Sequence, residues 1–456
     1  MQNKTFDFYN LAWRWHFYAG LFVAPFMILL SITGIIYLFK PQLDPLMYGD
    51  LLQVTPGQVR LSADEQLLHL HQQNPQLQVS QYLPAPAADR SAQFVAQLDG
   101  REVNAFVDPY SGKLLGLQDA RSNLQAMARA LHGELMIGTV GDRLIELAAG
   151  WGIVLVVSGL YLWWPRKRSL RVLLWPDLSR RGRALWRDVH MVVGFWGSLL
   201  MLFMLLTGMT WTGFWGKSFA DVWNRFPAAM WNEVPRSDLE ARTLNEAHRQ
   251  TIPWAMENTP MPMSGGAHAE HMAHGSSGMA MPQISLQQVV DSADQAGVTP
   301  GYAIALPKGA EGVFTVSVFA DDSRNDATLH IDQYTGKVLA DVRWKDYGLV
   351  AKSVESGVML HEGKMFGLFN QLLMLAVCLM ILLSAVSGLW IWWKRRPQGR
   401  LGVPPMPHAL PVWKGGVAIM LILGVAFPLV GASLLLVWAL DWAVLSRIKP
   451  RSPDMG

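Results

Sequence analysis

The sequence predicts an α-helical integral membrane bundle of about five transmembrane helices that carries two external α+β domains. The chain has 456 residues, of which 51% are hydrophobic and only 16% are charged, a balance that favours a membrane protein over a fully soluble one. Five apolar stretches are long enough to cross the hydrocarbon core, which takes about 20 residues. Two long polar segments carry helix and strand patterns, and the two halves of the chain align as an internal two-fold repeat.

Composition excludes several classes of site and partner. The single cysteine, Cys378, lies inside an apolar run, so the chain forms no internal disulfide, thiolate metal cluster or Cys-x-x-Cys-His haem attachment. The net charge is only +3, and no basic stripe interleaved with aromatic residues indicates nucleic acid binding. No Gly-x-Gly-x-x-Gly motif follows a strand and no phosphate loop is present, so the sequence gives no sign of a nucleotide or flavin site.

The predicted elements alternate between membrane helices and longer polar segments. In order, they are a transmembrane helix in 1–40, an external domain in 41–129, a helix in 130–165, a basic loop in 166–189, a helix in 190–215, an external domain in 216–357, a helix in 358–394, a loop in 395–411 and a helix in 412–446. The first helix is too long for a signal-peptide core and no cleavage site follows it, so it is predicted to be a retained anchor. The last stretch has Pro428 at its middle. Two separate spans would be too short there, so one long helix kinked at the proline is expected.

Lysine and arginine residues near the helix ends predict the orientation of the chain. The basic link after the second helix and the link beginning "KRRPQGR" after the fourth are expected in the cytoplasm, together with the N-terminus. The segments 41–140 and 216–360 then lie outside. The tail "SRIKPR" would also end outside, against the rule, so the side of the C-terminus stays open.

The basic loop after the second helix has two interpretations. It either docks an acidic flavoprotein or, more simply, marks the topology and contacts lipid headgroups. Its basic residues are Arg166, Lys167, Arg168, Arg171, Arg180, Arg181 and Arg183.

The external segments are each predicted to contain a short helix followed by a small sheet. In the first, "SADEQLLHLHQQNP" has Ser62 as N-cap and Glu65 three residues later, which is a helix start signal. The alternating stretch "QFVAQLDGREVNAFVDPYSGKLLG" then predicts strands joined by Asp-Gly and Ser-Gly turns. In the second, "SLQQVVDSADQAG" is the expected helix and "VFTVSVFADDSRNDATLHIDQYTGKVLAD" supplies the strands.

The internal repeat aligns the first helix with the third and the second with the fourth, without gaps. Internal symmetry of this kind commonly places a functional site where the two copies meet. The aligned pairs are His16 with His190, Gly20 with Gly194, Thr33-Gly34 with Thr207-Gly208, His132 with His361, Ser158-Gly159 with Ser387-Gly388, and Trp163-Trp164 with Trp392-Trp393.

These features together resemble the PepSY-associated transmembrane proteins. The resemblance rests on the helix–external domain–helix unit, the hairpins "FVDPYSGKLLG" and "HIDQYTGKVLA", the Leu-His openings, and the exits "SGLYLWWPRKR" and "SGLWIWWKRR". It covers nearly the whole chain and implies PepSY-like external domains in the periplasm of a bacterial inner-membrane protein. The family includes iron-regulated members and ferric-siderophore reductases, so the resemblance also implies iron uptake and an external ferric-siderophore complex as substrate.

Four repeated histidines are candidate haem ligands. His16 and His190 are expected at the cytoplasmic helix starts, and His132 and His361 on the external side. Two opposed imidazoles make a six-coordinate electron-transfer haem, so two non-covalent b-type haems are expected.

Two glycines support this interpretation. Gly20 and Gly194 each follow a histidine by one helical turn, where a missing side chain leaves room for a flat porphyrin. The alternative is that the histidines are ordinary polar residues at membrane helix ends. The resemblance supports ligation at these positions but not a particular pairing.

A Met/His-rich tract inserted at 256–282 is a second candidate metal site. Thioether sulfur suits Cu(I), and imidazole suits Cu(II), Ni(II) or Zn(II), while the Gly, Ser and Ala spacers predict a flexible segment without fixed geometry. Weak metal capture and a plain linker both stay open. The candidate ligands are His268, His271, His274, Met272, Met279 and Met281.

The sequence therefore leads to one main hypothesis and two alternatives. The main one is a dihaem transmembrane reductase that passes cytoplasm-side electrons to an external ferric complex and takes them from a separate flavoprotein or from quinol. The first alternative is a non-enzymatic metal-handling protein that collects metal with the Met/His-rich tract. The second is a membrane protein whose PepSY-like domains bind a periplasmic partner.

Overall fold

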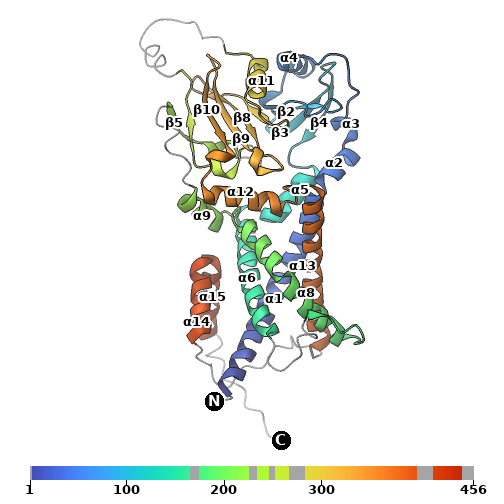
Figure 1. The fold of residues 1–456 in the computed structure, drawn as a ribbon, viewed down its shortest axis with the longest axis vertical. Coiled ribbons are helices and arrows are strands. Elements are labelled where there is room, and N and C mark those ends of the chain that lie inside the picture. Colours follow the sequence, from blue (N-terminus) through green and yellow to red (C-terminus); the bar gives the residue numbers. More distant parts are fainter. Residues whose placement is uncertain are drawn as a thin grey trace. The chain divides into compact units, whose positions relative to one another are not determined.

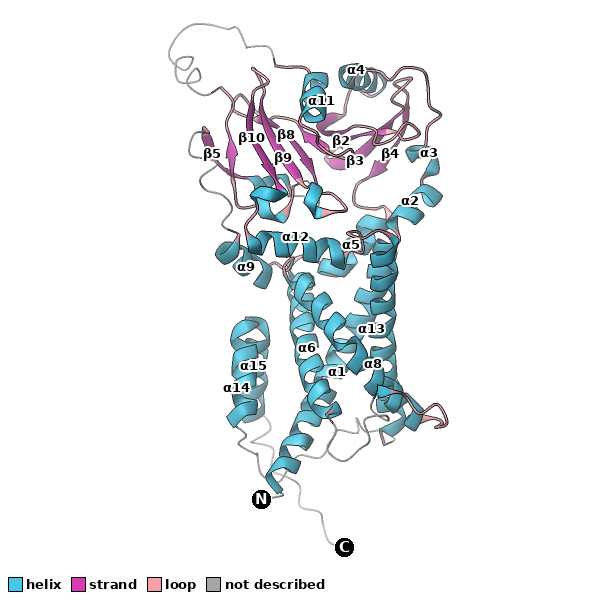
Figure 2. Cartoon of the chain, in the orientation of Figure 1, coloured by secondary structure: helices cyan, strands magenta, loops and turns pink. Residues whose placement is uncertain are grey.

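The computed structural model describes residues 3–164, 174–224, 234–245, 252–265, 283–397 and 414–443. The chain forms two compact units, which are described separately. The membrane unit consists of Met1–Ile35, Ala130–Ser218 and Leu375–Gly456, and the sheet unit of Ile36–Arg129 and Phe219–Met374. Figure 2 shows that helices dominate the first and that the strands belong to the second.

Four described helices are long and apolar enough to cross a membrane, which makes the chain a membrane protein. These helices are α1 (Asn3–Leu38), α6 (Thr139–Trp163), α8 (Arg183–Met209) and α13 (Leu368–Arg395) (Figure 1).

Aromatic side chains join these helices in the membrane unit. Trp15 on α1 stacks on Trp151 of α6, with ring centroids 6.2 Å apart. Trp163 on α6 stacks on Phe195 of α8 at 3.9 Å. Stacked pairs of this kind add to the dispersion energy of the packed helices, so α6 is held between α1 and α8.

The last apolar stretch differs from the predicted single kinked helix in 412–446. The structure has two helices, α14 (Lys414–Ala426) and α15 (Pro428–Ala443), and the chain reverses between them (Figure 1). A Cβ added at Gly424 would lie 3.4 Å from Cα of Gly431, although residues seven apart in one helix lie about 10 Å apart along its axis. Pro428 therefore starts a new helix instead of kinking an old one, and two glycines let the helices approach closely.

The reversal brings the two ends of the hairpin together, and side chains of other helices anchor it. Because the chain folds back, residues 414 and 443 lie at the same end of the hairpin. The hairpin is anchored by Trp151, whose Nε1 donates to Ser433 Oγ at 3.1 Å, and by Trp215, whose Nε1 donates to the Ala426 carbonyl at 2.7 Å.

Two further helix boundaries differ from the prediction. Instead of one helix in 130–165, the chain forms α5 (Leu124–Glu134) and then α6. Leu135, Met136 and Gly138 between them have positive φ angles, which an α-helix cannot contain. Likewise the predicted helix in 358–394 is divided into α12 (Leu349–His361) and α13.

The sheet unit contains one antiparallel sheet of eight strands, in the order β10-β9-β8-β7-β1-β2-β3-β4. The two segments predicted as separate external domains thus share a sheet, joined where β1 pairs with β7. The predicted Asp-Gly turn joins β2 to β3, with positive φ at Asp99 and Gly100. The strands are β1 (Gln78–Leu83), β2 (Ala92–Leu98), β3 (Arg101–Val107), β4 (Leu114–Asp119), β7 (Ala303–Ala305), β8 (Val313–Val318), β9 (Ala327–Asp332) and β10 (Val338–Arg343).

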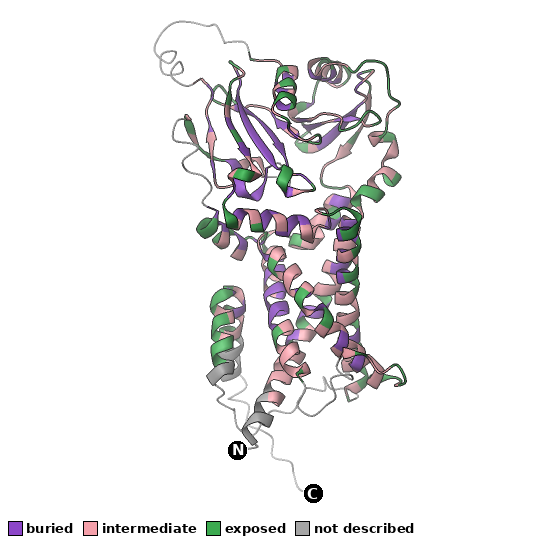
Figure 3. Ribbon diagram, in the orientation of Figure 1, coloured by how far each residue is buried: buried purple, intermediate pink, exposed green. Residues whose placement is uncertain are grey.

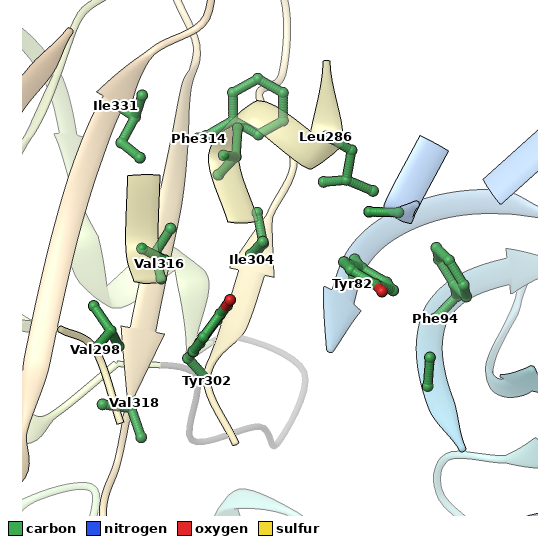
Figure 4. Close-up of a cluster of buried hydrophobic side chains, with 14 of the residues drawn as sticks. Tyr82, Phe94, Leu286, Val298, Tyr302, Ile304, Phe314, Val316, Val318 and Ile331 are labelled. Carbon is green, nitrogen blue, oxygen red and sulfur yellow. The ribbon is translucent and has the colours of Figure 1, made fainter. Parts of the chain in front are cut away.

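One hydrophobic core runs across both halves of this sheet. Strands β8 and β9 are buried along their whole length (Figure 3). Figure 4 shows Tyr82 beside Phe94 in one half and Ile304, Phe314 and Val316 in the other. Because the core is continuous, the two halves stabilise each other by burial of apolar surface.

Two helices, α4 (Ala63–Gln73) and α11 (Leu286–Gln295), also join the halves of the sheet unit. Each starts with a capping box, and the predicted one at Ser62 and Glu65 is confirmed. The second residue of each helix also caps the other helix. Asp64 accepts from the backbone N–H groups of Leu286 and Gln287, and Gln287 Oε1 accepts from Ala63 N at 2.8 Å. These reciprocal bonds satisfy N–H groups that a helix start leaves free.

The remaining elements are short. They are α2 (Lys40–Met47), α3 (Gly49–Leu52), α9 (Trp215–Trp223), β5 (Arg236–Glu240), β6 (Pro260–Pro262), and the 3-10 turns η2 (Ala241–Leu244), η3 (Trp254–Met256), η4 (Ser323–Asn325) and η5 (Trp344–Asp346).

Candidate functional site

His16 lies on α1 with its ring turned toward α6 in the membrane unit. Its Nδ1 lies 2.9 Å from Oγ of Ser158. The next residue of α6 is Gly159, where an added Cβ would lie 3.2 Å from Cε1 of the ring. The imidazole therefore rests edge-on against the α6 backbone, and Nδ1 is the nitrogen engaged by the protein.

His190 lies on α8 and meets α13 in the same manner. Its Nδ1 lies 3.1 Å from Oγ of Ser387 and 3.0 Å from the carbonyl oxygen of Ser384. A Cβ added at Gly388 would lie 3.3 Å from Cε1 of the ring. Two histidines from the two halves of the sequence are thus each fixed through Nδ1 by a Ser-Gly dipeptide.

The two imidazoles lie in the same unit of the chain. Both side chains are half-buried. No hydrogen bond of either Nε2 is found among the residues that the structure describes. A histidine that ligates a metal through Nε2 usually gives Nδ1–H to a second group, and the Nδ1 contacts of His16 and His190 are compatible with that arrangement.

The predicted glycines one turn after these histidines leave different amounts of space. A Cβ added at Gly194 would meet no described atom within 4 Å, and one added at Gly20 would lie 3.9 Å from Leu155 Cδ2. The α8 side therefore has room for a flat group beside His190, and the α1 side allows ordinary van der Waals contact. Ligation at these positions stays a prediction.

His132 lies in the last turn of α5 and meets α1. Its Nδ1 is 2.9 Å from Oγ1 of Thr33. A Cβ added at Gly34 would lie 3.7 Å from His132 Cε1 and 3.8 Å from Sγ of the buried Cys378. A hydroxyl residue followed by glycine thus faces this histidine as well.

His361 is the last residue of α12 in the sheet unit. Asn370 Nδ2 donates to the carbonyl of the preceding Leu360 at 3.1 Å, which fixes the end of the helix. Burial lowers the pKa of His361 to about 4, so the imidazole is neutral at physiological pH, as a metal ligand must be. Its pairing with His132 stays a prediction.

Two buried carboxyl groups in the sheet unit had no sequence signal. Asp326 is 2% exposed, and Glu355 on α12 is completely buried. Asp326 Oδ1 accepts from Ala320 N at 3.0 Å, and Glu355 Oε1 accepts from Ala255 N at 2.9 Å. Burial raises the pKa of Asp326 to about 8 and that of Glu355 well above its usual range, and the Asp326 carboxylate adds to the shift of Glu355.

Several predicted functional residues lie outside the described residues. These include the basic residues Arg166, Lys167, Arg168 and Arg171, and the Met/His-rich candidates His268, His271, His274, Met272, Met279 and Met281. Within the part of the chain that the structure describes, no three or more His, Cys, Asp or Glu side chains are grouped as a metal site.

Sequence reasoning identified the histidines but not the groups that hold them. Ser158-Gly159, Ser387-Gly388 and Thr33-Gly34 were visible as matched dipeptides of the repeat. Their role could not be derived because each partner histidine lies on another helix, as His16 does relative to Ser158.

Comparison with known proteins gives one result for the family. A family model described as the PepSY-associated TM region matches residues 13–395. No curated protein matches the chain. The family match includes the four described spans, and it also includes the histidines and the Ser-Gly dipeptides. Because the match covers most of the sequence, the chain belongs to the family of proteins with a PepSY-associated transmembrane region.

Proposed function

We propose that this protein is a haem-binding electron-transfer protein of the bacterial inner membrane that reduces an external ferric complex with cytoplasm-side electrons. One observation carries the proposal. His16 and His190, from the two halves of the chain, lie in the same membrane unit, and each is held through Nδ1 by a serine of a neighbouring helix. Nε2 is the nitrogen that remains for a ligand in both.

The residues around the pair suit a haem. The two imidazoles would hold the haem iron, and Gly194 leaves open space beside one of them. The ligands sit on long helices instead of loops, which keeps their geometry constant during electron transfer. When bound, haem would accept and release single electrons.

The second pair, His132 and His361, is assigned from the repeat and the family resemblance. We infer that the two halves are copies of one unit and that each face of the membrane has one non-covalent haem b. The face with the basic loops is the cytoplasmic one, and the sheet unit is periplasmic. Two such sites lie across a hydrocarbon core of about 30 Å, and the family setting of iron uptake makes a ferric siderophore the expected substrate.

The electron donor is a separate flavoprotein or quinol, because the sequence has no nucleotide motif. Basic side chains at the start of α8 support an acidic partner at that end. Arg180 and Arg187 are only partly buried, and both pair with the buried Asp188. The carboxylate holds these guanidinium groups in place and reduces the cost of keeping them together.

The experiment compares the haem content of His16→Ala and His190→Ala with that of a matched control. The control is His71→Ala, on α4. The full-length protein is expressed with haem, purified in detergent, and measured by absorption spectra before and after dithionite. The wild type and the control are expected to hold two low-spin haems per chain, and each test variant only one. A colourless wild type would overturn the function, and two haems in both test variants would overturn this ligand pair.

A further inference from the structure

We propose that Ser158, Ser387 and Thr33 are positioning residues that keep the proton of three histidines on Nδ1 and so present Nε2 as the ligating nitrogen. The inference rests on the proposed haem function, but the state of the imidazoles follows from hydrogen bonds alone. It concerns His16, His190 and His132.

The hydroxyl groups of two of these residues have an acceptor on their own helices. Ser158 Oγ donates to the Leu155 carbonyl at 3.3 Å, and Thr33 Oγ1 donates to the Leu29 carbonyl at 2.8 Å. A hydroxyl has one proton to give, and bonds to a carbonyl three or four residues back are common for Ser and Thr in helices. With the hydroxyl proton given to the helix carbonyl, the oxygen accepts from the histidine, and Nδ1 then carries the ring proton.

His190 leads to the same result by an independent route. Its Nδ1 lies 3.0 Å from the Ser384 carbonyl oxygen, which has no proton to donate. Nδ1 of a neutral His190 must therefore be the donor, whatever the orientation of the Ser387 hydroxyl. Ser387 Oγ also donates to this carbonyl at 3.1 Å, so its oxygen is a second acceptor for the same N–H.

The glycine after each hydroxyl residue completes the arrangement. A Cβ at Gly159 or Gly388 would lie 3.2 or 3.3 Å from Cε1 of the facing ring, closer than an ordinary van der Waals contact. Any larger residue would push the imidazole away from the hydroxyl. The hydroxyl–glycine dipeptide therefore works as one device, in which one residue bonds the ring and the next allows it to approach.

The structure also predicts an asymmetry between the two ligands. An acceptor on Nδ1–H makes Nε2 more basic, which favours the ferric state. His16 has one such acceptor, Ser158, whereas His190 has both Ser387 and the Ser384 carbonyl. Without Ser158, His16 should adopt both tautomers. Without Ser387, the Ser384 carbonyl should still accept from the Nδ1–H of His190.

The first test uses the full-length protein purified without haem and labelled with ring-15N histidine. Nitrogen chemical shifts report the tautomer, and the His16→Ala and His190→Ala variants assign the signals. Both histidines are expected as Nδ1–H tautomers in the wild type. Ser158→Ala should give a mixture at His16, and Ser387→Ala should leave His190 unchanged. Nε2–H tautomers in the wild type would overturn the inference without touching the proposed function.

The second test measures haem content and midpoint potential in the loaded protein. Ser158→Ala is expected to weaken haem binding about 10- to 100-fold and to raise the potential, while Ser158→Thr restores both. Ser387→Ala should change them less than Ser158→Ala does. The control is Ser198→Ala, since Ser198 Oγ donates to the Phe195 carbonyl at 2.7 Å. Equal values for Ser158→Ala and the control would overturn the positioning role, even if both proteins hold their haems.

Discussion

The buried carboxyl Asp326 should make the folded protein less stable as the pH rises. Its Oδ1 accepts from Ala320 N, and its Oδ2 has no hydrogen-bond partner among the described atoms. The pKa of Asp326 is raised from 3.8 to about 8, chiefly by burial and also by the nearby Asp322, whereas the hydrogen bond from Ala320 N and the charge of Lys364 oppose the shift. Glu355 titrates with it, because the two carboxyls interact.

The direction and the size of this change in stability with pH follow from proton linkage. Between the two pKa values the folded state binds a proton that the unfolded state has lost, so stability is fully present below pH 3.8 and falls as the pH rises toward 8. Each pH unit costs about 1.4 kcal/mol, so three units between pH 5 and 8 amount to about 4 kcal/mol for one carboxyl. That is a large part of the 5–15 kcal/mol typical of a folded domain.

The perturbation is Asp326→Asn, which removes the charge and keeps an oxygen acceptor for Ala320 N. Thermal unfolding of the full chain in detergent is measured from pH 5 to 8. The variant is expected to lose less stability over this range than the wild type and to be the more stable protein at pH 8. The control is Asp119→Asn, a carboxyl whose pKa is lowered by its bond to the Arg121 N–H. An equal loss of stability between pH 5 and 8 in the wild type and in Asp326→Asn would refute the reasoning.

Two further predictions concern packing within the units, and a third concerns the Met/His-rich tract. Asp64→Ala should cost about 1 kcal/mol of stability and more than Gln287→Ala, because the carboxylate accepts from two N–H groups; chemical unfolding of both single variants and the double variant measures this. Gly150→Ala should cost about 1–3 kcal/mol, since the new Cβ would lie 2.6 Å from Val430 Cγ2 of α15, and thermal unfolding checks it. Deleting 266–282 should leave the haem content of the purified protein unchanged, because none of the proposed haem ligands lies there.

Each of these has an outcome that contradicts it. A smaller loss of stability for Asp64→Ala than for Gln287→Ala would contradict the first prediction. The control for Gly150 is Gly49→Ala, where an added Cβ meets no described atom within 4 Å, and an equal melting temperature in both variants would argue against contact with α15. Loss of haem on deletion of 266–282 would contradict the third prediction. Loss of metal tolerance with intact haem reduction would favour a metal-handling role for the Met/His-rich tract.

Several features of the protein could be predicted from the sequence because they depend on neighbouring residues. A run of apolar side chains determines a membrane span by itself, and four such spans are described. The capping box at Ser62 and Glu65 needs only residues three positions apart. The Asp-Gly turn at Asp99 and Gly100 is equally local. The candidate histidines were found in the same way, from their positions along two aligned stretches.

Other features were decided only by the tertiary structure. Pro428 permits either a kinked helix or a reversal, and contact between Gly424 and Gly431 selects the reversal. Ser158 was visible as part of a matched dipeptide, but its bond to His16 depends on how α1 packs against α6. The raised pKa of Asp326 depends on burial by surrounding elements. The physical reason is common to all three. Local patterns fix which elements form, whereas hydrogen bonds, burial and charge between distant residues exist only once those elements have packed.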